Sequence, residues 1–155
     1  MLAFSNDYYG MIFRATQSVE LFCAYESNKH KVLVEYALRF IKDSVGEELS
    51  YFIETDINDG RPLPQLTMEG YRPDVFFEYN GVMFIGEAKT SDDILREHSI
   101  NQYYSYLKKC SLNQGHATFV LAVPLEDRAR ANNILVKIKK EIPGDYEVKA
   151  IGMIV

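Results

Sequence analysis

Asp74 and Glu87 are predicted to face each other across a β-hairpin. The runs 71–79 and 82–90 are rich in β-branched and aromatic residues, and Asn80-Gly81 between them is a strong hairpin signal, because both residues tolerate positive φ. A two-residue turn at this dipeptide places the two carboxylates opposite each other, about 4.5–5.5 Å apart at Cβ. Like charges so placed destabilise a strand pair, and a divalent cation between them would relieve the repulsion.

Lys89 falls on the same face as Glu87, because side chains alternate along a strand. Hard oxygen ligands suit Mg²⁺ or Mn²⁺, and a lysine beside the metal can orient a water or stabilise charge on a phosphate. The pattern indicates metal-assisted chemistry on phosphate. The alternative is a solvent-facing cluster of charges at the end of a hairpin. The same register predicts three further cross-strand pairs: Tyr79–Val82, Phe77–Phe84 and Val75–Gly86.

Helices are predicted before this hairpin. Apolar residues recur at three- and four-residue intervals over about 7–25 and again over about 29–43. Asn28 is a possible N-cap of the second helix and Gly46 a plausible end, although one helix with a break near 27–28 fits the pattern as well. The core face expected of the second helix consists of Leu33, Tyr36, Ala37, Phe40 and Ile41.

The remaining chain alternates between strand and helix patterns. We predict strands over 49–57, 117–123 and 146–155 and a loop over 58–70. One helix is predicted from the Ser91 N-cap to about Cys110, and another over 126–141, ending at Pro143-Gly144. The residues of the second helix expected to face the core are Ala129, Ile134, Leu135 and Ile138. The order α-α-β-β-β-α-β-α-β predicts an α/β fold with a mixed sheet flanked by helices.

Composition limits the kind of protein this is. The chain has 155 residues, 47% of them hydrophobic, which suits one globular domain. Its formal charge of −5 excludes nucleic-acid binding through bulk positive charge alone. Two cysteines are too few for a disulfide scaffold. With no run of roughly 20 apolar residues and no secretory leader pattern, we expect a cytoplasmic protein without a membrane partner.

The motif residues resemble a known nuclease signature. Pro73-Asp74, twelve intervening residues, and Glu87-Ala88-Lys89 look like the PD-(D/E)xK motif of the restriction-endonuclease-like superfamily. The order of a helix, three strands, a helix and a strand over roughly 29–124 also resembles that core. The resemblance implies that Asp74 and Glu87, with the Ala88 carbonyl, bind Mg²⁺. It further implies that Lys89 positions the attacking water or stabilises the pentavalent phosphate.

Gln102 and Tyr106 resemble the QxxxY element of the exonuclease-like and resolvase-like branches. Their i, i+4 spacing puts both on one helix face. An amide and a hydroxyl would then lie near the metal-bound water or a phosphate, although a surface Gln beside a core Tyr fits equally. Tyr103 and Tyr104 are candidates for stacking on bases, against the more usual place of such residues in a core or at its rim.

Other candidates lie around the motif. The branch often carries a Glu on the helix before the first core strand, and Glu35 fits that position as a further metal ligand, with Glu20 as an alternative. Local pairing with neighbouring basic residues explains Glu35 as well. Arg61 and Arg72 are expected to contact substrate, and His98 lies one turn before Gln102. The remaining candidates for phosphate contact are Lys108, Lys109, Arg128, Arg130, Lys137, Lys139 and Lys140.

We therefore expect residues 1–155 to be a single nuclease-like domain in which 1–28 form an N-terminal helical extension. The expected reaction is Mg²⁺-dependent hydrolysis of nucleic-acid phosphodiester bonds, with Mn²⁺ as a substitute metal and DNA favoured over RNA by the resemblance. A homodimer or a partner protein would supply specificity. The alternative function is a catalytically inactive subunit that keeps the fold and binds nucleic acid or protein.

Overall fold

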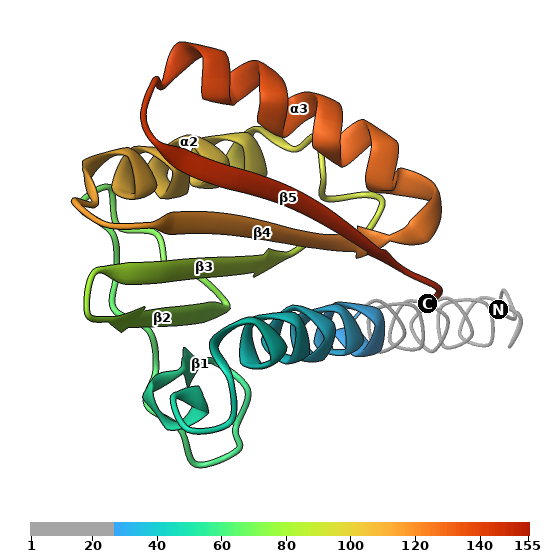
Figure 1. Ribbon diagram of the computed structural model, residues 1–155. Coiled ribbons are helices and arrows are strands. Elements are labelled where there is room, and N and C mark those ends of the chain that lie inside the picture. The colour runs from blue at the N-terminus through green and yellow to red at the C-terminus, as the bar shows by residue number, and fades with distance from the viewer. Residues whose placement is uncertain (1–26) are drawn as a thin grey trace, which may run out of the picture.

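A five-stranded mixed sheet forms the centre of the computed structural model, which describes residues 27–155 (Figure 1). The strand order is β1-β2-β3-β4-β5, with antiparallel pairing from β1 to β3 and parallel pairing from β3 to β5. The α/β class and the mixed sheet are therefore confirmed. After an N-terminal helix described from 27 to 45, the elements are η1 (Ser50–Phe52), β1 (Glu54–Thr55), β2 (Val75–Tyr79), β3 (Val82–Ala88), α2 (Glu97–Leu112), β4 (Ala117–Pro124), η2 (Leu125–Asp127), α3 (Arg128–Glu141) and β5 (Tyr146–Met153).

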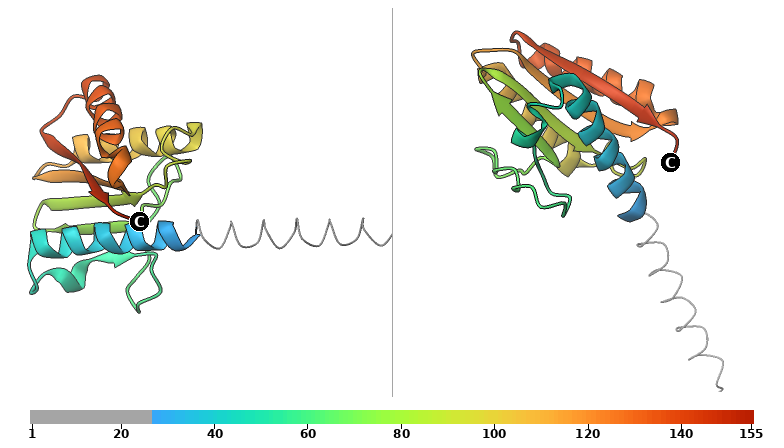
Figure 2. Two further views of the ribbon diagram at one scale, coloured as in Figure 1. Left: turned by 90° about the vertical axis from the view of Figure 1, so that its right-hand side faces the viewer. Right: turned by 60° about the horizontal axis from the view of Figure 1, so that its bottom comes forward.

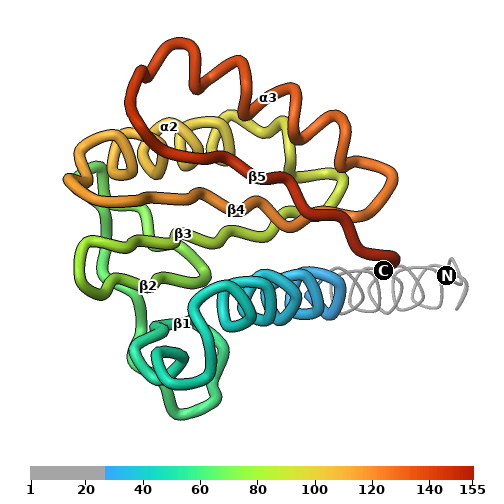
Figure 3. The backbone as a smooth tube through the Cα atoms, viewed as in Figure 1, coloured from blue at the N-terminus to red at the C-terminus, as the bar shows by residue number. Residues whose placement is uncertain are grey.

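The sheet has a helical layer on each face. Helices α2 and α3 cover one face, and the N-terminal helix covers the other (Figures 1 and 2). Both parallel connections, from β3 to β4 and from β4 to β5, pass through a helix on the same face (Figure 3). All eight residues of β4 are buried, as its continuous apolar run predicts for a strand covered on both sides. Within 27–155, no helix has the length and hydropathy of a bilayer span.

The predicted hairpin register is confirmed. Strands β2 and β3 pair in the order Tyr79–Val82, Phe77–Phe84 and Val75–Gly86, and Asn80 and Gly81 both adopt positive φ, at 48° and 79°. Two adjacent residues with positive φ are what a turn matched to the strand twist requires. The hairpin therefore carries its expected residues in their expected places.

The segment before the hairpin differs from its prediction. The helix does end at Gly46, which has φ +88° and donates its N–H to Lys42, but Asn28 lies inside the helix and does not cap it. The predicted strand over 49–57 is reduced to β1. A 3-10 turn takes up residues 50–52, and the Ser50 hydroxyl bonds back to the Glu47 carbonyl. Short-range bonding after the glycine thus replaces strand pairing there.

Strand β2 begins at Val75, later than predicted, because the backbone before it is otherwise engaged. Thr67 and Tyr71 bond to each other in a turn, and Pro73 has no N–H to donate. The Asp74 carbonyl instead accepts bonds from the Thr55 hydroxyl and the Asp56 N–H. Asp74 is therefore held at the end of the ladder.

Helix α2 begins six residues after the predicted N-cap. The Ser91 hydroxyl donates to the Asp127 carboxylate at 2.6 Å, and residues 91–95 form turns in place of a helix. These turns bury Ile94, whose carbonyl accepts a bond from the Tyr103 hydroxyl. A core contact and a distant carboxylate therefore override the capping signal.

The helix predicted over 126–141 is confirmed as α3, but its buried residues differ in part from those predicted. Its buried residues are Ala131, Leu135 and Ile138, whereas Ala129 is exposed and Ile134 is half-buried. The η2 turn before the helix shifts its start to Arg128, and the residues that pack into the core are 131, 135 and 138. The helix predicted over 7–25, with Glu20 and Cys23, lies outside the described residues.

Candidate active site

Asp74 and Glu87 come together at the open end of the hairpin. The β2–β3 ladder ends at Val75–Gly86, and the two acids lie just beyond this last pair: Asp74 directly precedes β2, and Glu87 is the next residue of β3. Both are buried, with Asp74 8% and Glu87 2% exposed. Asp74 Oδ2 accepts a 2.8 Å bond from the Ala88 N–H, which joins the two strands beyond the last ladder pair. The structure thus places two buried carboxylates close enough for the charge of Asp74 to act on Glu87.

Glu87 has one paired oxygen and one unpaired oxygen. Its Oε1 lies 2.8 Å from Lys89 Nζ, whereas within 27–155 no group makes a hydrogen bond of good geometry to its Oε2, although the Tyr106 hydroxyl is near enough to favour the charged carboxylate. Burial raises the pKa of Glu87 to about 8, and the negative charge of Asp74 adds to the shift, while the Lys89 ammonium opposes it. A buried polar oxygen without a partner is costly and calls for an explanation.

Lys89 links the hairpin to α2. Its ammonium donates to Gln102 Oε1 at 2.7 Å, and Gln102 Nε2 lies 3.4 Å from the Tyr106 hydroxyl. Burial raises the pKa of Tyr106, and the charge of Glu87 raises it further, so this hydroxyl keeps its proton. The predicted i, i+4 pair therefore lies on the buried face of α2, beside the predicted lysine.

His30 joins this cluster from the N-terminal helix. Its Nε2 lies 3.6 Å from Asp74 Oδ2, and the hydrogen bond with Asp74 raises the pKa of His30 against the opposing effect of burial. The sequence does contain a signal for it, since His30 is one helical turn before the buried Val34 and two before the buried Ala37. Glu35, predicted in this role, is exposed on a different side of the helix.

Asp56 is a second neighbour of Asp74 that sequence reasoning missed. Its N–H donates to the Asp74 carbonyl at 3.1 Å. Burial and the charge of Asp74 together raise the pKa of Asp56 to about 6. A surface cavity of about 310 Å³ lies between His30 and Asp56, so the cluster borders solvent on this side. The strand predicted over 49–57 includes this position, but no motif or spacing in the sequence linked Asp56 to Asp74.

The other predicted contacts lie apart from this cluster. The Arg61 guanidinium is held by the Asp59 carboxylate and the Ser50 carbonyl, and Arg72 is exposed. His98 is exposed, with its ring 5.4 Å from that of Tyr71. The two stacking candidates separate: Tyr103 is fully buried, whereas Tyr104 is half-buried and its hydroxyl bonds to Glu141.

The donor set fits a divalent cation. Two buried carboxylates with one imidazole at their edge supply the oxygen and nitrogen atoms that Mg²⁺ and Mn²⁺ accept. The unpaired Glu87 Oε2 is the observation behind this fit, because a cation beside it would satisfy the oxygen. Within 27–155, no three acidic, histidine or cysteine side chains are already gathered into a ligand group. The side chains would therefore close around the ion on binding.

Comparisons of this chain with protein-family models, with curated proteins and with solved structures find no match.

Proposed function

We propose that this chain is a metal-dependent nuclease with a PD-(D/E)xK site on a restriction-endonuclease-like core, and that it hydrolyses phosphodiester bonds, in DNA before RNA. The buried Glu87 carboxylate carries the proposal. It has an unpaired oxygen, stands beside Asp74 and is joined to Lys89. The positions of the motif support the same function, because Asp74 directly precedes β2 and Glu87 lies near the end of β3.

Asp74 and Glu87 would hold the cation, with His30 as a nitrogen ligand and the Ala88 carbonyl as the ligand implied by the family resemblance. Such an ion, when bound, activates water and neutralises charge on a phosphate. The Ala88 N–H meanwhile fixes the Asp74 carboxylate, since it donates to Oδ2. Burial of the cluster strengthens its electrostatic interactions.

Lys89 is preorganised to act on the phosphate. Two of its three N–H donors point to Glu87 Oε1 and Gln102 Oε1, at 2.8 and 2.7 Å. Within 27–155 no partner is seen for the third, which would donate to a phosphate oxygen or to the attacking water. Because Gln102 is itself held beside Tyr106, the ammonium is fixed before the substrate arrives. A fixed charge of this kind stabilises the transition state without a reorganisation cost.

The test is a cleavage assay with Mn²⁺ or with EDTA on duplex, single-stranded, flapped and branched DNA and on RNA. We expect Mn²⁺-dependent cleavage by the wild-type chain and a loss of about 100-fold or more in Lys89→Met and in Asp74→Asn. Lys149→Met and Asp145→Asn remove exposed charges and are matched controls that should keep full activity.

Wild-type cleavage that persists in both site variants would show a contaminating enzyme. If no substrate is cut in Mn²⁺ although the cation is bound, the chain is the inactive binding subunit. If cleavage is lost only in Asp74→Asn, Lys89 has no part in the reaction.

A further inference from the structure

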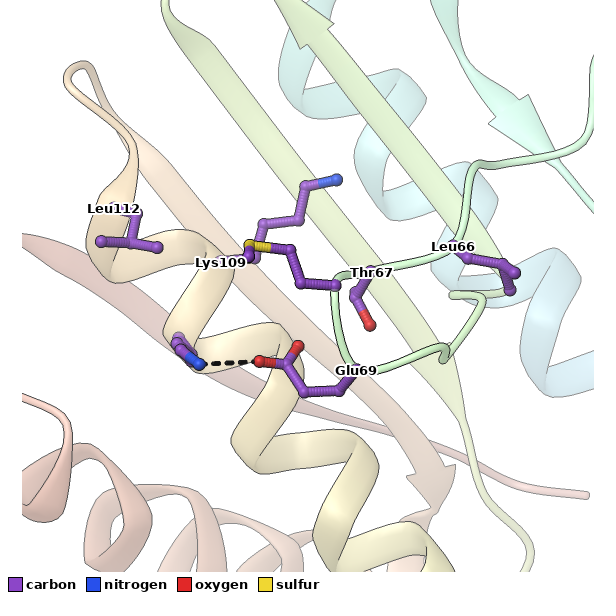
Figure 4. A pocket seen from close by; sticks show the side chains of 7 residues that line it. Leu66, Thr67, Glu69, Lys109 and Leu112 are labelled. Carbon is purple, nitrogen blue, oxygen red and sulfur yellow. Dashed lines mark hydrogen bonds and ion pairs between the residues drawn. The ribbon is translucent and has the colours of Figure 1, made fainter.

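A groove with aromatic walls runs along the outer side of α2, next to the candidate active site. It encloses about 330 Å³ and is lined by Tyr71, Asn101, Tyr104, Ser105 and the Glu69–Lys108 ion pair. We call it the tyrosine groove. An apolar hollow of about 200 Å³ lies on the other side of that ion pair, around Leu66, Met68 and Leu112 (Figure 4).

Both walls of the tyrosine groove contain residues that lie close in sequence to residues of the candidate active site. On the helix wall, Asn101 and Ser105 bracket Gln102, and a rise of 1.5 Å per residue keeps the three within about 6 Å along the axis. On the loop wall, Tyr71 lies three residues before Asp74. The ring of Tyr71 also contacts that of His98, one turn before Gln102 on α2.

The side chains that line the tyrosine groove suit the base of a nucleotide better than its phosphate. Two tyrosine rings and an amide match the flat face and the polar edge of a nucleobase. The groove does not suit a phosphate, because the Lys108 ammonium is already paired with Glu69 at 2.8 Å. Hydrogen bonds from Lys108 and Ser105 lower the pKa of Glu69, so this carboxylate remains charged and repels phosphate.

The loop wall is held in place. The Ser105 hydroxyl bonds to Thr67 Oγ1 and Glu69 Oε2, both at 2.7 Å. These bonds, together with the ion pair, join the loop to α2 directly beside Tyr71, so the groove exists before any ligand binds. A preformed site of this kind loses little conformational freedom on binding.

We infer that the tyrosine groove binds an unpaired nucleobase of the strand being cut, and that single-stranded nucleic acid is therefore the preferred substrate. This inference rests on the proposed nuclease function. A base in duplex is stacked and paired, so its faces cannot reach Tyr71 and Tyr104. The groove thus selects for frayed ends, flaps or single strands.

The test is fluorescence anisotropy with a labelled oligothymidylate, an oligouridylate and a matched duplex, in EDTA so that nothing is cleaved. Tyr104→Ala should weaken single-strand binding at least about fivefold, whereas Tyr104→Phe keeps the ring and should stay within about twofold of wild type. Asn101→Ala, an exposed position, should also weaken single-strand binding. Leu112→Ala, in the apolar hollow, is the matched control and should leave it unchanged.

Wild-type affinity in Tyr104→Ala overturns the inference, as does an equal loss for Tyr104→Phe or an equal loss on the duplex. If the chain cuts nucleic acid but its affinity for oligonucleotides does not depend on Tyr104, the tyrosine groove does not bind a base, and the nuclease function is unaffected. If the chain cuts nothing in Mn²⁺ but its affinity for oligonucleotides depends on Tyr104, the nuclease function is wrong, and base binding in the tyrosine groove is supported. The oligouridylate shows whether the groove also accepts the bases of RNA.

Discussion

Glu87 is the residue on which the proposed chemistry depends, and its environment disfavours its charged form. It is 2% exposed, has one unpaired oxygen and lies beside Asp74. The Lys89 ammonium, 2.8 Å from Glu87 Oε1, offsets part of this cost, and the Tyr106 hydroxyl adds to that effect. A cation bound beside Glu87 would offset the negative charge there.

The stability of the metal-free protein should fall as pH rises from about 4.5 to about 8. In this window the unfolded chain has released the Glu87 proton and the folded chain still holds it, because its pKa is raised to about 8. The expected slope is up to roughly 1 kcal/mol per pH unit, measured by urea unfolding in EDTA. Glu87→Gln should reduce this slope, with the raised pKa of Asp56 still contributing below about pH 6, and the exposed Glu126→Gln should leave it unchanged. An identical slope in Glu87→Gln would show that Glu87 is ionised in the folded metal-free state.

The predictability of the site from sequence differs from residue to residue. Asp74, Glu87 and Lys89 follow from one hairpin turn, because local pairing fixes their register. Gln102 and Tyr106 follow from helical spacing once the family resemblance is seen. His30 reaches Asp74 only through the packing of a distant helix on the sheet, which one sequence does not specify.

At the scale of elements, the N-terminal helix is placed on the sheet by close contact with β3. A Cβ at Gly86 would lie 3.0 Å from Ile41 Cδ1 and 3.1 Å from Val75 Cβ. The absence of a side chain at this position lets the helix approach and brings His30 to Asp74. The start of α2 could not be predicted for a related reason. Ser91, which was expected to cap this helix, instead bonds to Asp127, far along the chain.

Gly86→Ala should therefore destabilise the protein. Overpacking at such a contact costs about 1–3 kcal/mol, which corresponds to a fall of several degrees in Tm for a chain of this size. Thermal unfolding measures it, with the exposed Glu35→Ala as the control. If Gly86→Ala keeps the wild-type Tm, the helix does not pack on β3 in this way.

His30 and Glu35 lie on the same helix, but we expect cation binding to depend on His30 and not on Glu35. Mn²⁺ should raise the Tm of the wild-type chain and of Glu35→Ala by similar amounts, because binding to the folded state stabilises it. His30→Ala removes a candidate ligand beside Asp74, so the Mn²⁺-induced shift should shrink. A shift that shrinks only in Glu35→Ala would restore the role predicted from sequence for that residue.

At the scale of the whole molecule, charge is distributed unevenly. Residues 45–93 hold 11 acidic and 3 basic residues, whereas 94–155 hold 6 and 9. The acidic part contains β1 to β3 and the candidate site, where a bound cation would offset some of the charge. The uneven distribution of charge can be predicted from the sequence, but which of the acidic side chains lie close together is seen only in the fold.

Oligonucleotide binding should accordingly show a shallow salt dependence. A chain of formal charge −5 that neutralises about two phosphates would lose only about tenfold in affinity between 50 and 200 mM salt, against 10³- to 10⁵-fold for 6–10 contacts. Anisotropy titrations at several salt concentrations give the slope. A steep slope would reveal an extended basic surface, with the lysines and arginines of α3 as its first candidates.

Calorimetric titration with Mn²⁺ tests most directly whether Asp74 and Glu87 form a cation site. We expect a binding heat for the wild-type chain, the same heat for the control Glu126→Gln, and affinity at least about tenfold weaker in Glu87→Gln. Absence of binding to the wild-type chain, or equal binding to Glu87→Gln, would contradict this expectation.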